Sequence, residues 1–166
     1  MQEKSDVFKT KNDLSEEIRV QAVALLNARL ADCVDLQTQT KQAHWNVKGP
    51  NFIGLHELFD KINEDVEEYV DTIAERAVQL GGVAEGTARM VAKRSSLAEY
   101  PANAEDGSSH VDALSSALAS VGKAVRKAIN QANELRDLDT SDLFTEVSRG
   151  IDKWLWFVEA HLQADR

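Results

Sequence analysis

Residues 52–80 read FIGLHELFDKINEDVEEYVDTIAERAVQL, and this stretch decides the fold class. Its apolar side chains recur at alternating intervals of three and four residues, the spacing of a helix face that packs on other helices. Asn51 precedes the stretch as a good N-cap residue, and Gly81-Gly82 ends it. We therefore expect one long helix whose packing face consists of Leu55, Leu58, Ile62, Val66, Tyr69, Ile73, Ala77 and Leu80.

Three further segments show the same helical periodicity, at residues 14–47, 105–135 and 141–163. Asp13 and Glu16 form a plausible capping box at the start of the first segment, and Asp139 and Thr140 are N-cap candidates before the last. Strand-like alternation is absent, and proline occurs only at positions 50 and 101. The sequence therefore predicts an all-α fold.

A connection of about 24 residues, 81–104, separates the second and third long helices, and residues 87–92 can form a short helix within it. Structureless connections of this length are uncommon in compact domains. If the second and third long helices lie parallel, the chain must travel back along the bundle, and one long crossover of this kind is the ferritin-like arrangement. We predict a ferritin-like four-helix bundle over residues 14–166, preceded by a short flexible tail at 1–13.

Composition narrows the class of protein. The 166 residues carry a net charge of −9 and contain a single cysteine, Cys33. An acidic surface disfavours sequence-independent DNA binding, which neutralises phosphates, and suits a protein that attracts small cations. Neither a membrane-spanning apolar run nor a signal-peptide pattern occurs, so we expect a cytoplasmic location.

Residues 44–75 carry the chemistry. His56 and Asp60 are four apart on the expected helix, as are Asp71 and Glu75, so each pair shares a face. Together with His44 they form a set of imidazoles and carboxylates without thiolate, which suits iron or another borderline divalent metal. Zinc could bind the same ligands. A solvated acidic face, to which Glu64 and Glu67 would also belong, is the competing interpretation.

The spacing of these residues indicates where a metal could bind. A di-iron site inside one bundle uses Glu-x-x-His motifs, and this sequence contains none. His56 and Glu75 are 19 residues apart, or about 28 Å along one helix, so they cannot bind the same ion within one chain. A two-fold dimer with antiparallel copies of the helix would bring them together twice. The spacing predicts a site shared between subunits.

At these residues the sequence resembles the family of DNA-binding proteins from starved cells (Dps). The resemblance extends over essentially the whole chain from about residue 14. Its motifs are KQAHWNVKGPNF at 41–52, LHE at 55–57 followed by Asp60, DTIAERAVQLGG at 71–82, and DKWLWF at 152–157.

The resemblance implies a ferroxidase in a homo-dodecamer, with a metal site at each two-fold interface. It places His44 and His56 on one subunit, while Asp60, Asp71 and Glu75 complete the paired sites, with Asp71 and Glu75 from the partner. It implies oxidation of Fe(II) to Fe(III), preferably by hydrogen peroxide and alternatively by oxygen, and storage of ferric mineral; the sequence itself does not give the preference between the two oxidants. Trp45 and Trp156 match family tryptophans near the centre, where they could intercept an oxidising radical, although core packing is an equal alternative for Trp156.

Two further roles are hypotheses. Lys41 lies three residues before His44, so its charge could weaken a second iron position. The family also places acidic pores near the start of the last helix, which would serve as an iron entry here, although helix capping is the competing role for Asp139 and Asp142. The acidic residues there are Asp137, Asp139, Asp142 and Glu146.

The chain departs from family members that condense DNA through lysine-rich tails. Residues 1–13 hold three lysines against three acidic residues, and the last six residues are not basic. We therefore expect weak or no DNA binding. The alternatives are a nucleoid-associated, DNA-protecting protein whose metal binding is incidental, and a structural helical oligomer with a solvated acidic face.

Overall fold

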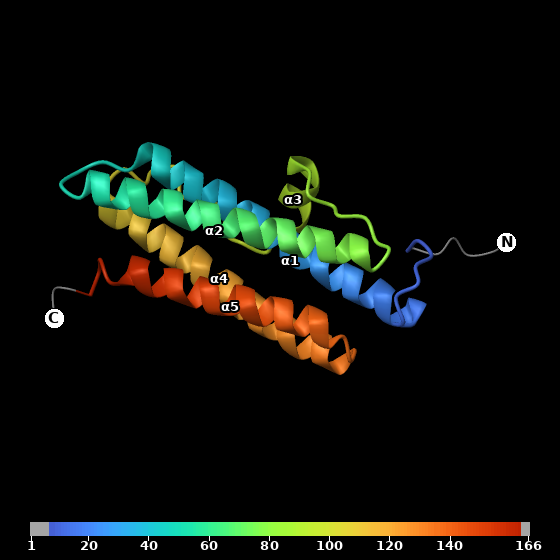
Figure 1. The fold of residues 1–166 in the computed structure, drawn as a ribbon. Coiled ribbons are helices and arrows are strands. Elements are labelled where there is room, and N and C mark those ends of the chain that lie inside the picture. Colours follow the sequence, from blue (N-terminus) through green and yellow to red (C-terminus); the bar gives the residue numbers. More distant parts are fainter. Residues whose placement is uncertain (1–6, 164–166) are drawn as a thin grey trace.

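The computed structural model describes residues 7–163, and five helices make up most of this range, without a β-strand. Four helices are long and one is short (Figure 1). They are α1 (Glu16–Asn46), α2 (Phe52–Gln79), α3 (Ala88–Arg94), α4 (Gly107–Glu134) and α5 (Leu138–Glu159). The prediction of an all-α fold is confirmed.

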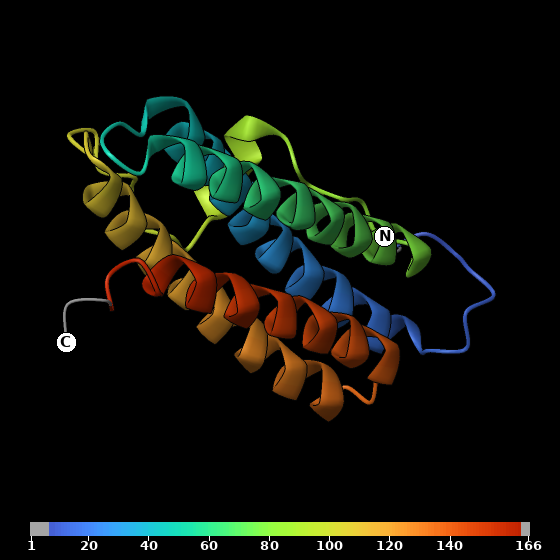
Figure 2. The same ribbon diagram turned by 60° about the vertical axis from the view of Figure 1, so that its left-hand side comes forward.

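The long helices form two antiparallel hairpins, α1 with α2 and α4 with α5, packed side by side (Figures 1 and 2). The α2 and α4 helices run in the same direction (Figure 1). The chain must therefore return along the bundle between them, and it does so through the crossover that contains α3. This is the ferritin-like connectivity that the long 81–104 segment predicts.

The core lies between the two hairpins and contains the predicted apolar face of α2. Phe59 and Ile62 from α2 are fully buried together with Leu26 of α1, Leu118 of α4 and Phe144 of α5. Each such side chain contributes about 1.5–3 kcal/mol when it leaves water. The packing orients α2 so that its acidic face points away from the core.

Two of the predicted helix starts were wrong. The N-cap of α1 is Ser15, whose Oγ accepts a hydrogen bond from the backbone N–H of Ile18 at 3.3 Å, so the Asp13 capping box does not form. Asp137 is the N-cap of α5, which places Asp139 within the first turn. At α5 the ion pair between Asp137 and Arg76 of α2 fixes Asp137 at the helix start.

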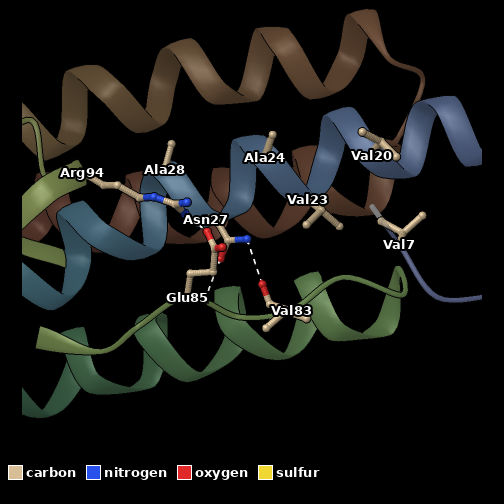
Figure 3. Close-up of a pocket in the computed structure, with 9 residues that line it drawn as sticks. All are labelled: Val7, Val20, Val23, Ala24, Asn27, Ala28, Val83, Glu85 and Arg94. Carbon is tan, nitrogen blue, oxygen red and sulfur yellow. Dashed lines mark hydrogen bonds and ion pairs between the residues drawn. The ribbon is translucent and has the colours of Figure 1, made fainter. Parts of the chain in front are cut away.

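Buried polar side chains of α1 bind the backbone of the crossover. The side chain of Asn27 donates to the Val83 carbonyl at 2.9 Å and accepts from the Glu85 N–H at 2.9 Å (Figure 3). Further along α1, Asp32 accepts from the Ser96 N–H at 2.8 Å and Gln39 donates to the Ala98 carbonyl at 3.0 Å. The crossover is therefore fixed along α1, which explains why this helix buries polar residues.

The N-terminal segment lies against the end of α2. Val7 is buried, and the Phe8 N–H donates to the Gly81 carbonyl at 2.7 Å. Arg19 donates from Nη1 to the carbonyls of Phe8 and Leu80. Residues 1–6 of the predicted flexible tail are outside the described residues. Between residues 7 and 163, no helix combines the length and apolarity needed to cross a membrane.

Candidate metal centre

The short turn between α1 and α2 brings His44 and His56 together. Gly49 adopts a φ of 110° in this turn, a conformation that favours glycine. The two imidazole rings stack with centroids 3.8 Å apart and planes inclined by 21°. His44 lies in the last turn of α1, and His56 lies at the start of α2. The turn thus joins two residues that the sequence separates by twelve positions.

The two histidines hold one another through their backbones. Nδ1 of His44 lies 2.8 Å from the His56 carbonyl oxygen, and Nδ1 of His56 lies 2.8 Å from the His44 carbonyl oxygen. Because a carbonyl can only accept, Nδ1 must carry the proton in both rings. Each Nε2 then presents a lone pair. A fixed tautomer with Nδ1–H bound to a backbone carbonyl is the usual arrangement of metal-binding histidines.

Asp60 lies one turn beyond His56 and beside both histidines. Its Oδ1 is 3.8 Å from Nδ1 of His44 and 2.7 Å from Nζ of Lys41. The hydrogen bond from Lys41 lowers the pKa of Asp60, with smaller contributions from the charges of Lys41 and the two histidines. The carboxylate is 44% exposed, so it remains reachable from outside the chain. In the single chain, therefore, the cation that pairs with Asp60 is the Lys41 ammonium.

Asp71 and Glu75 lie three to four turns further along α2 and are both exposed. No hydrogen bond or ion pair engages their side chains among the described residues. No group of three or more His, Cys, Asp or Glu side chains within residues 7–163 of one chain is arranged to hold a metal ion. One chain thus brings together His44, His56 and Asp60 and leaves Asp71 and Glu75 apart from them.

The tryptophans differ in how far their side chains are exposed. Trp45 is 67% exposed next to His44. Trp156 is 62% exposed on α5 and packs edge-on against Phe157, so the core-packing alternative for Trp156 is wrong within the single chain. The buried tryptophan is Trp154, whose Nε1 donates to Asp65 at 2.8 Å. Sequence reasoning missed this pair because the two residues lie 89 positions apart.

The acidic residues at the start of α5 divide into two groups. Asp137 is buried, accepts from the Thr140 N–H at 3.1 Å and pairs with Nη2 of Arg76 at 2.8 Å. Asp139, Asp142 and Glu146 are exposed. Asp137 therefore caps the helix and neutralises a cation of α2, whereas the side chains of the other three are open to solvent, with Asp139 at 4.0 Å from the same guanidinium.

Comparisons with known proteins agree with this architecture. A ferritin-like domain matches residues 23–166. A DNA protection during starvation protein of Agrobacterium fabrum is 46% identical over 155 residues, covering 93% of this chain and 96% of that protein. A Dps structure from Mycobacterium smegmatis superposes with a TM-score of 0.90 at 34% identity, covering 95% and 96% of the two chains.

A third comparison bears on metal binding. A Dps structure of Microbacterium arborescens, described as the high iron form, has a TM-score of 0.84 and 33% identity with this chain. The match covers 93% of this chain and 99% of that one. This chain is thus similar to a Dps protein whose structure is described as a high iron form.

Proposed function

The chain belongs to the family of DNA protection during starvation proteins, the Dps proteins with a ferritin-like domain, and on this basis we propose that it is an iron-storing ferroxidase. Its substrate is Fe(II), its product is Fe(III), and hydrogen peroxide is the preferred oxidant over oxygen. The ferric product accumulates as mineral inside a shell of twelve subunits. The observation that carries the proposal is the reciprocal His44–His56 arrangement, which stacks the two rings and engages both Nδ1 atoms, so that Nε2 of each ring is left to bind a metal.

Each iron site draws its ligands from two subunits. His44, His56 and Asp60 come from one subunit, and Asp71 and Glu75 come from the partner. The exposure of Asp71 and Glu75 supports this assignment, because exposed carboxylates without partners in one chain are available to a second. Imidazoles and carboxylates together suit ferrous iron, and the carboxylates favour the harder ferric product. Zinc could occupy the same ligands.

The reaction with peroxide balances when two ferrous ions act together. Each ion gives one electron, the O–O bond breaks, and two water molecules form after uptake of two protons. No hydroxyl radical is released on this route, so the reaction would protect the cell against oxidative stress. A single ferrous ion with peroxide would instead give hydroxide and a hydroxyl radical. Holding two ions close together is therefore the contribution of the protein.

Lys41 tunes the second iron position. Its ammonium already binds the Asp60 carboxylate at 2.7 Å, so a ferrous ion at Asp60 must displace or repel it. We expect this competition to make the second ion transient, so that it is passed on rather than retained.

Iron would reach the interior through an acidic pore. Asp139, Asp142 and Glu146 are exposed at the start of α5, and three copies around an axis would focus cations into a channel. Asp137, the fourth acidic residue of the predicted pore, stabilises the start of α5 instead of attracting ions, because its carboxylate is buried against Arg76.

DNA protection is the second candidate function, because the curated relatives bear that name. The net charge of −9 opposes it, since DNA binding depends on neutralising phosphates. We propose weak or absent DNA binding in a cytoplasmic protein, with association to the nucleoid as the alternative. A mobility shift of plasmid DNA at physiological salt would establish the alternative.

The ferroxidase proposal is tested by adding ferrous iron without oxygen, then adding peroxide and following ferric absorbance. The parent protein should oxidise iron rapidly with about two ferrous ions consumed per peroxide, as the balance of the two-electron route requires. Asp71→Ala and Glu75→Ala should lose this rate. Glu68→Ala is the matched control, because Glu68 is exposed on α2 and lies outside the ligand set. Equal rates in all four proteins would refute the proposed site.

A further inference from the structure

Buried His110 and half-buried Tyr100 form a polar pair that the ferroxidase site does not use. The Tyr100 hydroxyl oxygen lies 2.5 Å from Nδ1 of His110, and the rings are inclined by 20° with centroids 6.0 Å apart. His110 is 1% exposed in the first turn of α4, and Tyr100 is half-buried on the crossover beside Pro101. The fold thus fixes a phenol directly against an imidazole.

The hydrogen bond runs from the phenol to the imidazole. If Nδ1 carried the proton, the phenol hydrogen would have no acceptor among the described residues. If Nδ1 accepts instead, the ring proton sits on Nε2, which is buried without a hydrogen bond of ordinary geometry but lies near the backbone of Asn46. The second tautomer gives the phenol hydrogen a protein acceptor and turns the Nε2 proton toward the Asn46 backbone, so we assign Tyr100 as the donor and His110 as the base.

We propose that Tyr100 and His110 are a redox pair that captures one-electron oxidants. An electron leaves the phenol, its O–H bond breaks, and the proton moves to Nδ1 of His110, where a new N–H bond forms. The oxidant, a hydroxyl radical or an oxidised tryptophan, takes the electron and is reduced. A ferrous ion can then return an electron to the tyrosyl oxygen while His110 returns the proton, which regenerates both side chains.

The ionisation of the two groups fits this role. Burial raises the pKa of Tyr100 to about 12 and lowers the pKa of His110. At neutral pH the phenol is therefore protonated and the imidazole neutral, so the proton stays on the phenol until an electron is removed. His110 is already hydrogen-bonded to the phenol, so it then accepts the proton directly and not by way of solvent.

The pair lies on the side of the molecule where oxidants would arise. Tyr100 and Trp45 line the same groove along α1, together with Lys41 and Gln42. The backbone of Asn46, two residues after His44, lies beside His110. A radical formed by one ferrous ion and peroxide at the candidate metal centre thus arises one residue from Trp45, which shares a groove with Tyr100. This part of the inference rests on the proposed function.

Tyr69 provides a natural control, since the sequence contains only two tyrosines. The Tyr69 ring packs on α5, where its hydroxyl occupies the space a side chain at Gly150 would need. Burial raises its pKa to about 12 as well, with further contributions from Asp65, Glu146 and Glu68. Tyr69 has no imidazole beside its hydroxyl, so it should be a poor one-electron donor despite similar burial.

The first experiment uses the metal-free protein and needs no iron chemistry. A photochemically generated one-electron oxidant is mixed with the parent and the variants, and radicals trapped by freezing are identified by electron paramagnetic resonance. We expect a tyrosyl signal in the parent and in Tyr69→Phe, and its loss in Tyr100→Phe. Persistence of the tyrosyl signal in Tyr100→Phe, or its loss in Tyr69→Phe, would overturn the proposal.

A second variant tests the base. His110→Asn keeps a hydrogen-bonding group beside the phenol but cannot take up the proton, so the tyrosyl yield should fall several-fold. Helical circular dichroism and solution mass establish that each variant is folded and assembled. An undiminished yield in folded His110→Asn would show that the imidazole has no role.

The same proteins are then loaded with ferrous iron and mixed with peroxide, and ferric absorbance is recorded beside the radical signal. Ferric absorbance should be unchanged in Tyr100→Phe, because Tyr100 binds no iron, while radical density should move from tyrosine to tryptophan. Failure of the parent to oxidise iron would overturn the proposed function alone, because the photochemical result for the pair does not depend on it.

Discussion

Asp137 gives the sharpest quantitative prediction, because one buried carboxylate both caps α5 and neutralises Arg76. Its side chain is 1% exposed and lies 2.8 Å from Nη2 of Arg76, whose own side chain is 11% exposed. Asp137→Ala loses an N-cap, which costs about 1 kcal/mol. It also breaks the buried ion pair of Arg76 and leaves that guanidinium only the exposed Asp139 carboxylate at 4.0 Å, and breaking a buried pair costs about 3–5 kcal/mol. The hydrogen bond from Arg76 to Thr140 remains, so we take the lower end.

The sum is about 4 kcal/mol, which lowers the melting temperature by about 8–16 °C in a chain of this length. Thermal unfolding followed by circular dichroism, at one protein concentration, measures the change. Asp139→Ala is the matched control. The Asp139 carboxylate lies 4.0 Å from Nη2 of the same Arg76 but its side chain is 88% exposed, so its loss should change stability by less than about 0.5 kcal/mol. Equal melting temperatures for the two variants would refute the assigned role of Asp137.

Three further predictions follow from single contacts. Lys41→Ala should bind ferrous iron more tightly at the second position, because the ammonium no longer pairs with Asp60. Titration calorimetry without oxygen measures this affinity, and an unchanged value would speak against the competition between Lys41 and iron. The melting temperature of the parent should fall as the pH drops below 6.5, because burial lowers the pKa of His110 and the unfolded chain then binds the proton more readily. His110→Asn should flatten this pH dependence, and an equally steep fall in the variant would contradict the role of His110. Gly81→Ala should destabilise the protein by at least about 1 kcal/mol, because Gly81 has a φ of 85° and an added Cβ would lie 2.5 Å from a backbone oxygen. Gly86→Ala, which meets only ordinary contacts, should unfold like the parent, and a similar loss in both variants would exclude this explanation.

Much of the fold could be predicted from the sequence because the apolar period of α2 is regular and the crossover is long. Helix ends were less predictable. Ser15 was overlooked beside Asp13, and Asp137 beside Asp139, because capping depends on which residue the tertiary structure places at the helix start. In the second case the partner that holds Asp137 is Arg76, which lies 61 positions away in the sequence.

The candidate site was predictable only in part. Helical spacing places Asp60 one turn from His56, but it cannot show that His44 and His56 bind one another's carbonyls, since that depends on the turn at Gly49. The contact between Tyr100 and His110 was missed for the same reason, because it joins the irregular crossover to α4. Contacts made by turns and loops leave no periodic signal in a sequence.

The claim at the centre of the account is that two chains complete each iron site, and mixed shells test it directly. Shells are assembled from equal amounts of His44→Ala/His56→Ala and Asp71→Ala/Glu75→Ala subunits, each inactive alone. Random pairing makes half of the dimers mixed, and each mixed dimer holds one intact and one doubly damaged site. The mixture should therefore recover about a quarter of the parental ferroxidase activity. Mixed shells as inactive as either variant alone would mean that each site belongs to a single chain.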